Sequence, residues 1–151
     1  FGEAYAKAQT ASGVTIPTLG VSLISFRVRD KPGAVRLARL LIDRGFEIVA
    51  THGTADVLDA AGVRCRRANK VREGRPHIVD MIKNDEISLI VNTTEGKRAI
   101  NESNSIRREA VSRKVTYYTT LSAAVATCEA IDHLQEVEVN RLQDLHSEVH
   151  V

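Results

Sequence analysis

The stretch EIVATHGTADVL, residues 47–58, joins a short apolar run to a segment with helical spacing. The junction between them reads Thr51-His52-Gly53-Thr54. The free N–H groups at the start of a helix attract anions, and glycine lets a ligand approach the backbone closely. This stretch therefore indicates a strand followed by a helix, and it predicts that the junction holds a phosphate.

The same alternation extends outward along the chain. Asp30 is expected to cap the next helix. Pro32 is tolerated in the first turn of that helix, and Gly45 is expected to end it. Strands are predicted at residues 20–28, 46–50, 62–66, 87–91 and 115–118, with helices at 54–61, 76–84, 97–113 and from 119 onward. Such alternation predicts an α/β, three-layer α/β/α fold with a five-stranded parallel sheet. The stretch 137–151 is predicted to begin as an edge strand and to end amphipathic.

Residues 1–18 differ from the rest of the chain. FGEAYAKAQ has the composition of a short helix, and TASGVTIPT, with Gly, Ser, Thr and Pro, has that of a linker. We expect residues 1–18 to be a helix remnant and a linker, and residues 19–151 to form one domain.

Composition excludes several classes of protein. The 21 Lys and Arg against 19 Asp and Glu leave a net charge of +2, and there is no Trp, so a nucleic-acid partner is not expected. No apolar run approaches the about 18 residues of a membrane span, and no signal peptide is seen. Cys65 and Cys128 lack metal or redox spacing and are expected to be free thiols, as in a cytoplasmic protein. No metal site is expected.

Small polar residues follow the expected strands one after another. They are Asp30 and Lys31, Thr51 to Thr54, Asn92 to Thr94 and Thr119 with Thr120, and Lys70 lies in the loop at residues 68–76. In parallel sheets ligands bind beyond the carboxyl ends of the strands. Hydroxyls and lysines there suit a phosphorylated small molecule. The alternative for each threonine is a plain helix cap.

A hydrolytic or dinucleotide-dependent enzyme is less well supported. His52 and His77 are the candidate bases, but the sequence contains no G-x-S-x-G, G-x-G-x-x-G or Walker motif. The residues alone therefore favour a phosphate-binding module and leave a small phosphate-handling enzyme as the alternative.

Several motifs carry a specific resemblance. THGTA (51–55), NKVREGRPHI (69–78), IVNTTEGKRA (90–99), Ser105 to Arg108 and YYTTL (117–121) occur in this order. Over about residues 20–130 the chain closely resembles the C-terminal regulatory domain of the carbamoyl phosphate synthase large subunit. The resemblance implies a methylglyoxal-synthase-like allosteric domain at residues 19–151. It also implies that residues 1–18 are the end of the preceding synthetase domain and its linker, since FGEAYAKAQ is similar to the helix that closes that domain.

The resemblance also implies a role. The parent enzyme is an ATP-dependent, glutamine-hydrolysing ligase that uses ATP and Mg to make carbamoyl phosphate for pyrimidine and arginine biosynthesis. Its partners are the synthetase domains of the large subunit and, indirectly, the glutaminase small subunit. This domain is expected to be non-catalytic, without a cofactor, and to bind UMP as inhibitor and IMP as activator. The sequence leaves homo-oligomer formation open.

The family's functional positions fall on residues of this chain. The resemblance implies effector phosphate binding by Ser25, Lys31, Thr51, Gly53, Thr54 and Lys70. It implies ribose or base binding by Val71, Ile78, Asn92, Thr93 and Thr94. Relatives that bind acetylglutamate lack the lysine at the position of Lys70, so Lys70 favours a nucleotide.

The resemblance to methylglyoxal synthase supplies an alternative function, that of a small phosphate-handling lyase. That enzyme needs a carboxylate base in a Gly-Gly-Asp stretch, and this chain has Glu73-Gly74-Arg75-Pro76 there. Glu73 is the neighbouring carboxylate that spacing alone leaves open as a base.

Overall fold

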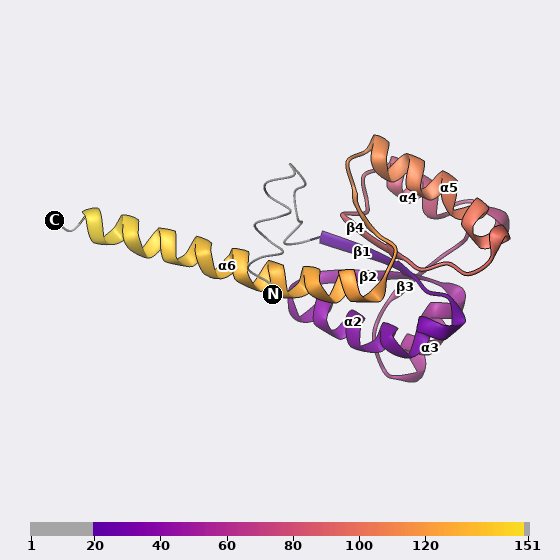
Figure 1. The fold of residues 1–151 in the computed structure, drawn as a ribbon, viewed down its shortest axis with the longest axis horizontal. Helices are drawn as coiled ribbons and strands as arrows, with labels where there is room; N and C mark the ends of the chain where they lie inside the picture. The colour runs from indigo at the N-terminus through magenta and orange to yellow at the C-terminus, as the bar shows by residue number, and fades with distance from the viewer. Residues whose placement is uncertain (1–19, 150–151) are drawn as a thin grey trace.

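The computed structural model describes residues 20–149, with side chains at 20–134 and 136. Strands alternate with helices along the chain (Figure 1). The elements are β1 Gly20–Ser25, η1 Val28–Asp30, α2 Lys31–Asp43, β2 Phe46–Thr51, α3 His52–Ala60, β3 Arg66–Ala68, η2 Val71–Glu73, α4 Ile78–Lys83, β4 Leu89–Asn92, α5 Lys97–Ser112, β5 Thr116–Tyr118 and α6 Leu121–Val149.

All five strands of the described sheet are parallel, in the order β3-β2-β1-β4-β5. The chain moves outward from β1 through β2 to β3, then returns to place β4 on the other side of β1. This reversal of strand order lies between β1 and β4, and ligands of open α/β sheets bind at such a point. Ser25 pairs with Asn92 in the register there, so the ends of β1 and β4 lie side by side.

Helices cover both faces of the sheet because neighbouring strand residues point to opposite sides. Ile24 faces one apolar cluster, which includes Leu37 and Leu41 of α2, Leu58 of α3 and Ile131 of α6. Leu23 faces the other cluster, with residues of α4 and α5 such as Ile82 and Ile106. The expected three-layer α/β/α fold with five parallel strands is confirmed.

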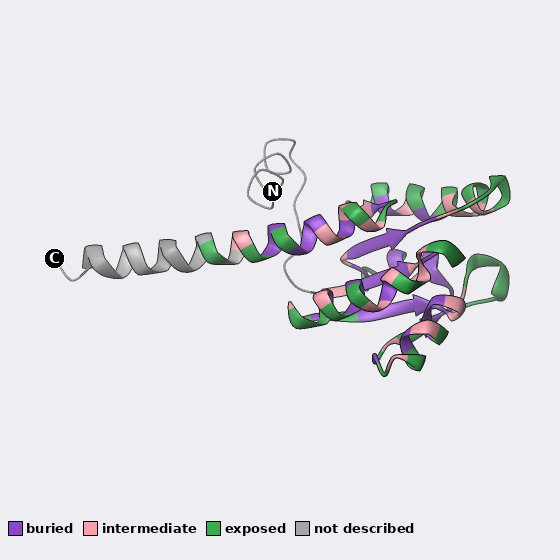
Figure 2. Cartoon of the chain, turned by 60° about the horizontal axis from the view of Figure 1, so that its bottom comes forward, coloured by how far each residue is buried: buried purple, intermediate pink, exposed green. Residues whose placement is uncertain are grey.

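The last helix, α6, packs on α2 over its first turns and then extends away from the sheet (Figures 1 and 2). Arg44, just after α2, fastens the packed part. Its guanidinium donates to the Cys128 carbonyl at 3.1 Å and the Leu40 carbonyl at 2.7 Å, and it pairs with the Asp132 carboxylate at 2.6 Å. One side chain therefore satisfies carbonyls of both helices.

Several predicted boundaries were wrong. Residues 137–149 are helical, not an edge strand, since no Gly or Pro interrupts the chain after Leu121. The third strand lies at Arg66–Ala68 because Gly62 and Val63 close α3, and the Val63 amide donates to the Leu58 carbonyl at 2.9 Å.

Other differences are smaller. The first strand ends at Ser25, and the fourth helix begins at Ile78. Asp30 stands at the cap position of α2 without capping it, because its carboxylate accepts from Arg27 Nε at 2.6 Å. The prediction for residues 1–18 lies outside the described residues.

Candidate functional site

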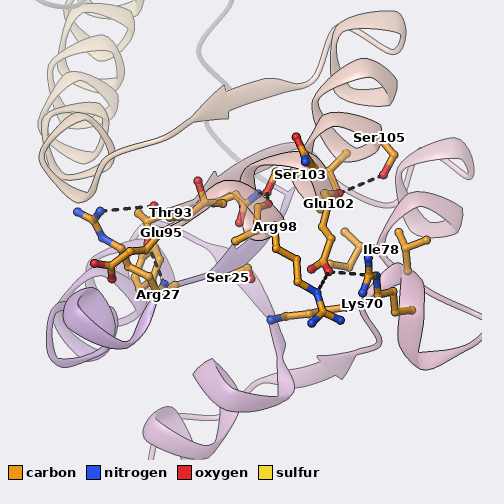
Figure 3. A pocket seen from close by; sticks show the side chains of 18 of the residues that line it. Ser25, Arg27, Lys70, Ile78, Thr93, Glu95, Arg98, Glu102, Ser103 and Ser105 are labelled. Carbon is orange, nitrogen blue, oxygen red and sulfur yellow. Dashed lines mark hydrogen bonds and ion pairs between the residues drawn. The ribbon is translucent and has the colours of Figure 1, made fainter.

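A cavity of about 780 Å³ opens beyond the carboxyl ends of β1 and β4 (Figure 3). One wall is the segment of η2 with the start of α4, and the facing wall is the first half of α5. Its lining includes Ser25, Arg27, Lys70, Val71, Glu73, Ile78, Asn92, Thr93, Thr94, Arg98, Glu102, Ser103 and Ile106. The volume lies in the range of about 300–1,000 Å³ that is usual for small-molecule sites.

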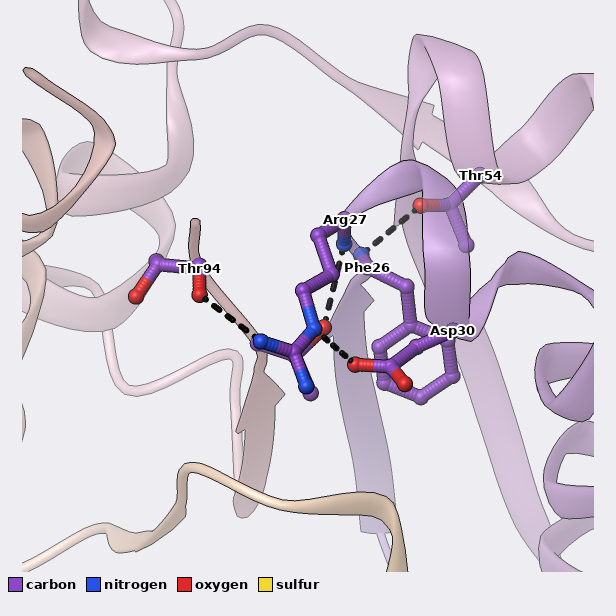
Figure 4. A network of polar contacts seen from close by, with 6 residues as sticks. Phe26, Arg27, Asp30, Thr54 and Thr94 are labelled. Atoms are coloured by element: carbon purple, nitrogen blue, oxygen red, sulfur yellow. Dashed lines mark hydrogen bonds and ion pairs between the residues drawn. The ribbon is translucent and has the colours of Figure 1, made fainter. Parts of the chain in front are cut away.

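Three hydroxyls near the strand ends, those of Ser25, Thr54 and Thr93, all act as hydrogen-bond acceptors toward the rest of the protein. Thr54 Oγ1 accepts from the Phe26 amide at 2.9 Å (Figure 4). Thr51 donates to Ser25 Oγ at 2.9 Å, and Thr93 Oγ1 accepts from the Arg27 amide at 3.0 Å. Ser25, Thr54 and Thr93 each accept a hydrogen bond from the protein, so each keeps its own proton to donate. Ser25 and Thr93 line the cavity, which therefore has hydroxyl donors at this end.

Two lysines lie near these hydroxyls. A Cβ added at Gly53 would come 2.7 Å from Lys31 Nζ, so the absent side chain at Gly53 leaves room for the ammonium beside the start of α3. Lys70 lines the cavity and is exposed. Neither lysine forms an ion pair with a residue that the structure describes, so both charges remain open to a ligand.

Arginines of the site are already engaged. Arg27 pairs with Asp30 at 2.6 Å and donates to the Thr94 carbonyl at 3.4 Å (Figure 4). On the facing wall, Glu102 Oε1 accepts from Arg98 Nε at 3.2 Å (Figure 3). The same oxygen accepts from Arg72 Nε at 3.0 Å. This cluster ties α5 to the loop that carries Lys70.

The predicted phosphate residues divide into two groups. Ser25 and Lys70 line the cavity, as do all five residues predicted for the ribose or base, Val71, Ile78, Asn92, Thr93 and Thr94. Lys31, Thr51, Gly53 and Thr54 lie directly behind the Ser25 end, outside the lining. Thr51 contacts Ser25, and Thr54 holds the backbone that follows it.

The helix-cap alternative is correct for Thr120, whose Oγ1 accepts from the Ala123 amide at 3.2 Å at the start of α6. It does not describe Thr51 or Thr54. Thr51 occupies the cap position of α3 with no side-chain cap hydrogen bond, because its hydroxyl donates to Ser25. Thr54 is 1% exposed and bonds across the sheet edge to Phe26 rather than to its own helix. Both hydroxyls serve the end of β1, beside the cavity.

Sequence reasoning missed the contribution of α5. Arg98, Glu102, Ser103 and Ile106 line the cavity from this helix. The helix directly follows the Asn-Thr-Thr run, and Arg98 and Glu102 have the i, i+4 spacing of a helical ion pair. The place of this helix directly after a strand end was the signal in the sequence from which its contribution to the site could have been predicted.

The candidate bases have structural partners. His77 caps α4 by accepting from the Asp80 amide, and His52 Nε2 lies 3.0 Å from Asn69 Oδ1. Glu73 Oε1 accepts from the Lys70 amide at 2.7 Å. Within the described part of the chain no group of His, Cys, Asp and Glu could hold a metal ion, and no described helix could span a membrane. Cys65 and Cys128 are free thiols, as predicted.

Comparison with known proteins agrees with this geometry. A family model described as the MGS-like domain matches residues 33–119. The chain belongs to the MGS-like domain family. The match covers β2, α3, β4 and most of the cavity lining.

Curated relatives extend the match over nearly the whole chain. The chain is 56% identical over 147 residues to the carbamoyl phosphate synthase large chain of Pseudomonas putida, and 54% identical over 147 residues to that of Pseudomonas aeruginosa. Each alignment covers 97% of this chain and 14% of the relative. The resemblance to this domain of the large subunit is confirmed, and the chain spans about 14% of the length of these relatives.

Among solved structures, a methylglyoxal synthase from Elizabethkingia anophelis shares the fold. The TM-score is 0.60, with 15% identity, over 76% of this chain and 80% of that one. At this identity the likeness concerns the fold alone.

Proposed function

We propose that this MGS-like domain is the regulatory domain of a carbamoyl phosphate synthase large chain and binds nucleoside monophosphates in the cavity at β1 and β4. In this proposal UMP inhibits and IMP activates the synthesis of carbamoyl phosphate for pyrimidines and arginine. The domain carries no chemistry of its own and needs no cofactor, while the parent enzyme uses ATP and Mg. The relatives' name supports the parent enzyme.

The observation that carries the proposal is the polarity of the strand ends. Ser25 and Thr93 line the cavity with free hydroxyl protons, and Lys70 and the nearby Lys31 have no described ion-pair partner. A phosphate monoester has a charge of about −1.5 to −2 at neutral pH and several acceptor oxygens. Donors and unpaired ammonium groups match that chemistry, because charge-assisted hydrogen bonds are the strong ones.

The rest of the cavity suits a nucleoside. Val71, Ile78 and Ile106 supply apolar surface on facing walls, and Ile78 and Ile106 are buried. Asn92 supplies an amide between the two walls. Apolar side chains on two facing walls, with polar groups between and around them, suit a flat ring with a polar edge.

Regulation requires a partner, because allostery is a coupling free energy between two sites. In the proposal the second site lies in the synthetase domains, since the relatives are far longer than this chain. The glutaminase small subunit would respond only indirectly. Effector binding would then change the affinity for ATP by roughly 5- to 150-fold.

The alternative is a lyase of the methylglyoxal synthase type, which requires a free carboxylate base in this cavity. Glu73 is held by the Lys70 amide, and Glu102 is neutralised by Arg72 and Arg98. Glu95 also lines the cavity. The contacts of Glu73 and Glu102 favour binding over catalysis, and Glu95 is the carboxylate of the lining that would have to act as the base in the lyase alternative.

Calorimetry with UMP, IMP and acetylglutamate, beside an assay of dihydroxyacetone phosphate, tests the proposal. We expect saturable binding of at least one nucleotide, weaker binding of acetylglutamate, and no turnover. Turnover at ordinary enzyme rates of about 1–1,000 per second would favour the lyase. Preference for acetylglutamate would contradict the nucleotide class.

A further inference from the structure

Asn92, the last residue of β4, is held by two hydroxyls from different elements. Its Nδ2 donates to Ser103 Oγ of α5 at 3.0 Å and to the Tyr117 hydroxyl of β5 at 2.9 Å. The side chain is 5% exposed and lines the cavity. An amide has a donor end and an acceptor end, so these two contacts decide which end a ligand meets.

Ser103 fixes the choice. Its hydroxyl donates to the Ala99 carbonyl, one turn earlier in α5, at 2.9 Å. A carbonyl oxygen can only accept, so the single proton of Ser103 is used there, and toward Asn92 the Ser103 oxygen can only accept. The neighbouring atom of Asn92 must therefore be Nδ2. Its second proton is taken by Tyr117, which leaves Oδ1 without a hydrogen-bond partner among the residues that the structure describes.

We propose that Ser103 is a positioning residue that turns the Asn92 amide so that Oδ1, an acceptor, is the atom offered to the ligand. The inference rests on the proposed function in taking a nucleoside monophosphate as the ligand. It adds that this ligand must donate a hydrogen bond at Asn92, from a ring N–H or a ribose hydroxyl. The cavity then has donors at the end where Ser25 lies (Figure 3) and an acceptor at Asn92.

Removing the Ser103 hydroxyl would release this constraint. In Ser103→Ala the amide can turn by about half a rotation and offer Nδ2 instead, because rotation about this terminal bond is permissive. The variant should then tolerate a ligand without the donor. Ser105→Ala is the matched control, since Ser105 also lines the cavity from α5 and donates to a backbone carbonyl, that of Glu102 at 3.3 Å, but accepts no hydrogen bond from Asn92.

The experiment compares the binding of UMP with that of N3-methyl-UMP, 2′-deoxy-UMP and 3′-deoxy-UMP, each lacking one donor. In the wild type we expect one analogue to bind roughly 5- to 150-fold more weakly than UMP, the loss expected when a buried acceptor loses its partner. In Ser103→Ala that penalty should shrink severalfold, and in Ser105→Ala it should persist. In the free protein, both Asn92 Nδ2 protons should exchange with solvent faster in Ser103→Ala.

The inference is overturned if all three analogues bind the wild type like UMP, or if Ser103→Ala keeps the full penalty. Binding of uridine, which lacks the phosphate, distinguishes a failure of the Ser103 inference from a failure of the proposed function. If uridine binds as tightly as UMP, the phosphate site is wrong, and the same analogues as nucleosides still test Ser103. If uridine, UMP and IMP all fail to bind, both proposals are contradicted. If IMP alone binds, N1-methyl-IMP, 2′-deoxy-IMP and 3′-deoxy-IMP replace the UMP analogues in the same comparison.

Discussion

Single hydroxyls at the strand ends determine the hydrogen bonds that the cavity can offer. When a neighbouring group of the protein donates to a hydroxyl oxygen, the proton of that hydroxyl is left to donate to a ligand. Thr54 is the clearest case. Its oxygen accepts from the buried Phe26 amide at 2.9 Å, which ties α3 to the segment after β1. The sequence shows a threonine near a helix start and predicts either a cap or a phosphate ligand. The partner 28 positions away in the chain follows only from the fold.

We predict that Thr54→Ala leaves the Phe26 amide buried without an acceptor. An unsatisfied buried donor costs about 1–3 kcal/mol of unfolding free energy. For a chain of this size that lowers the melting temperature by roughly 2–12 °C, at about 2–4 °C per kcal/mol. Denaturant unfolding measures the effect, and Thr54→Ser, which keeps the hydroxyl, is the control. Equal stability of the alanine variant and the wild type would contradict the assigned bond.

Among the elements, α2 and α6 are joined both by hydrogen bonds and by a shared apolar cluster. Arg44 bonds to carbonyls of both, and Cys128 of α6 is buried in the shared apolar cluster. Burial raises the pKa of the Cys128 thiol to about 11, and the Arg44 guanidinium opposes the rise only in part. The thiol therefore stays protonated in the native protein over a range in which it ionises in the unfolded chain.

This difference predicts a loss of stability in alkali. As the pH rises from about 9 toward about 11, the unfolded chain releases the Cys128 proton while the native state retains it, so the unfolding free energy falls. Below about pH 9 both states are protonated and the contribution is fully present. Denaturant unfolding of the wild type and Cys128→Ala from pH 8 to 11 should give curves that converge. Parallel curves would show that the thiol does not titrate differently in the two states.

The elements also show what the sequence could foretell. Alternating strands and helices, with apolar runs such as Ile87 to Val91, predicted the parallel sheet and its layers because periodicity is local. The predicted position of the third strand, residues 62–66, was wrong because Gly62 and Val63 form the turn that closes α3, although their sequence is typical of a strand. The edge strand predicted from Val137 was wrong because the β-branched residues there lie in a continuous helix. Tertiary context overrides propensity at such places.

At the scale of the whole molecule, the reversal of strand order between β1 and β4 creates the cavity and gathers its residues from four separate segments. The residues implied by family resemblance lie in or directly behind the cavity. The α5 wall and the Ser103 contact to Asn92 could not be predicted, since they depend on how α5 packs over the end of β4. The chain spans about 14% of the length of its curated relatives, and in the proposed function ligand binding here is coupled to a second site in such a longer chain.

The central claim is that the cavity binds the phosphate of a nucleotide, and Lys70 tests it most directly. The measurement is the thermal shift of the wild type, Lys70→Ala and Lys83→Ala with IMP and with inosine. Lys83 is an exposed lysine outside the cavity lining. At about 100 times the dissociation constant, IMP should add about 2.7 kcal/mol, or roughly 5–11 °C, to the wild type and Lys83→Ala.

In Lys70→Ala the account predicts that the shift with IMP falls to that with inosine, because the lost group is a charge partner of the phosphate, while unliganded stability stays within about 0.5 kcal/mol of the wild type. An IMP shift in Lys70→Ala equal to that of the wild type would contradict the account, as would a wild type whose melting temperature does not respond to IMP or UMP at millimolar concentration.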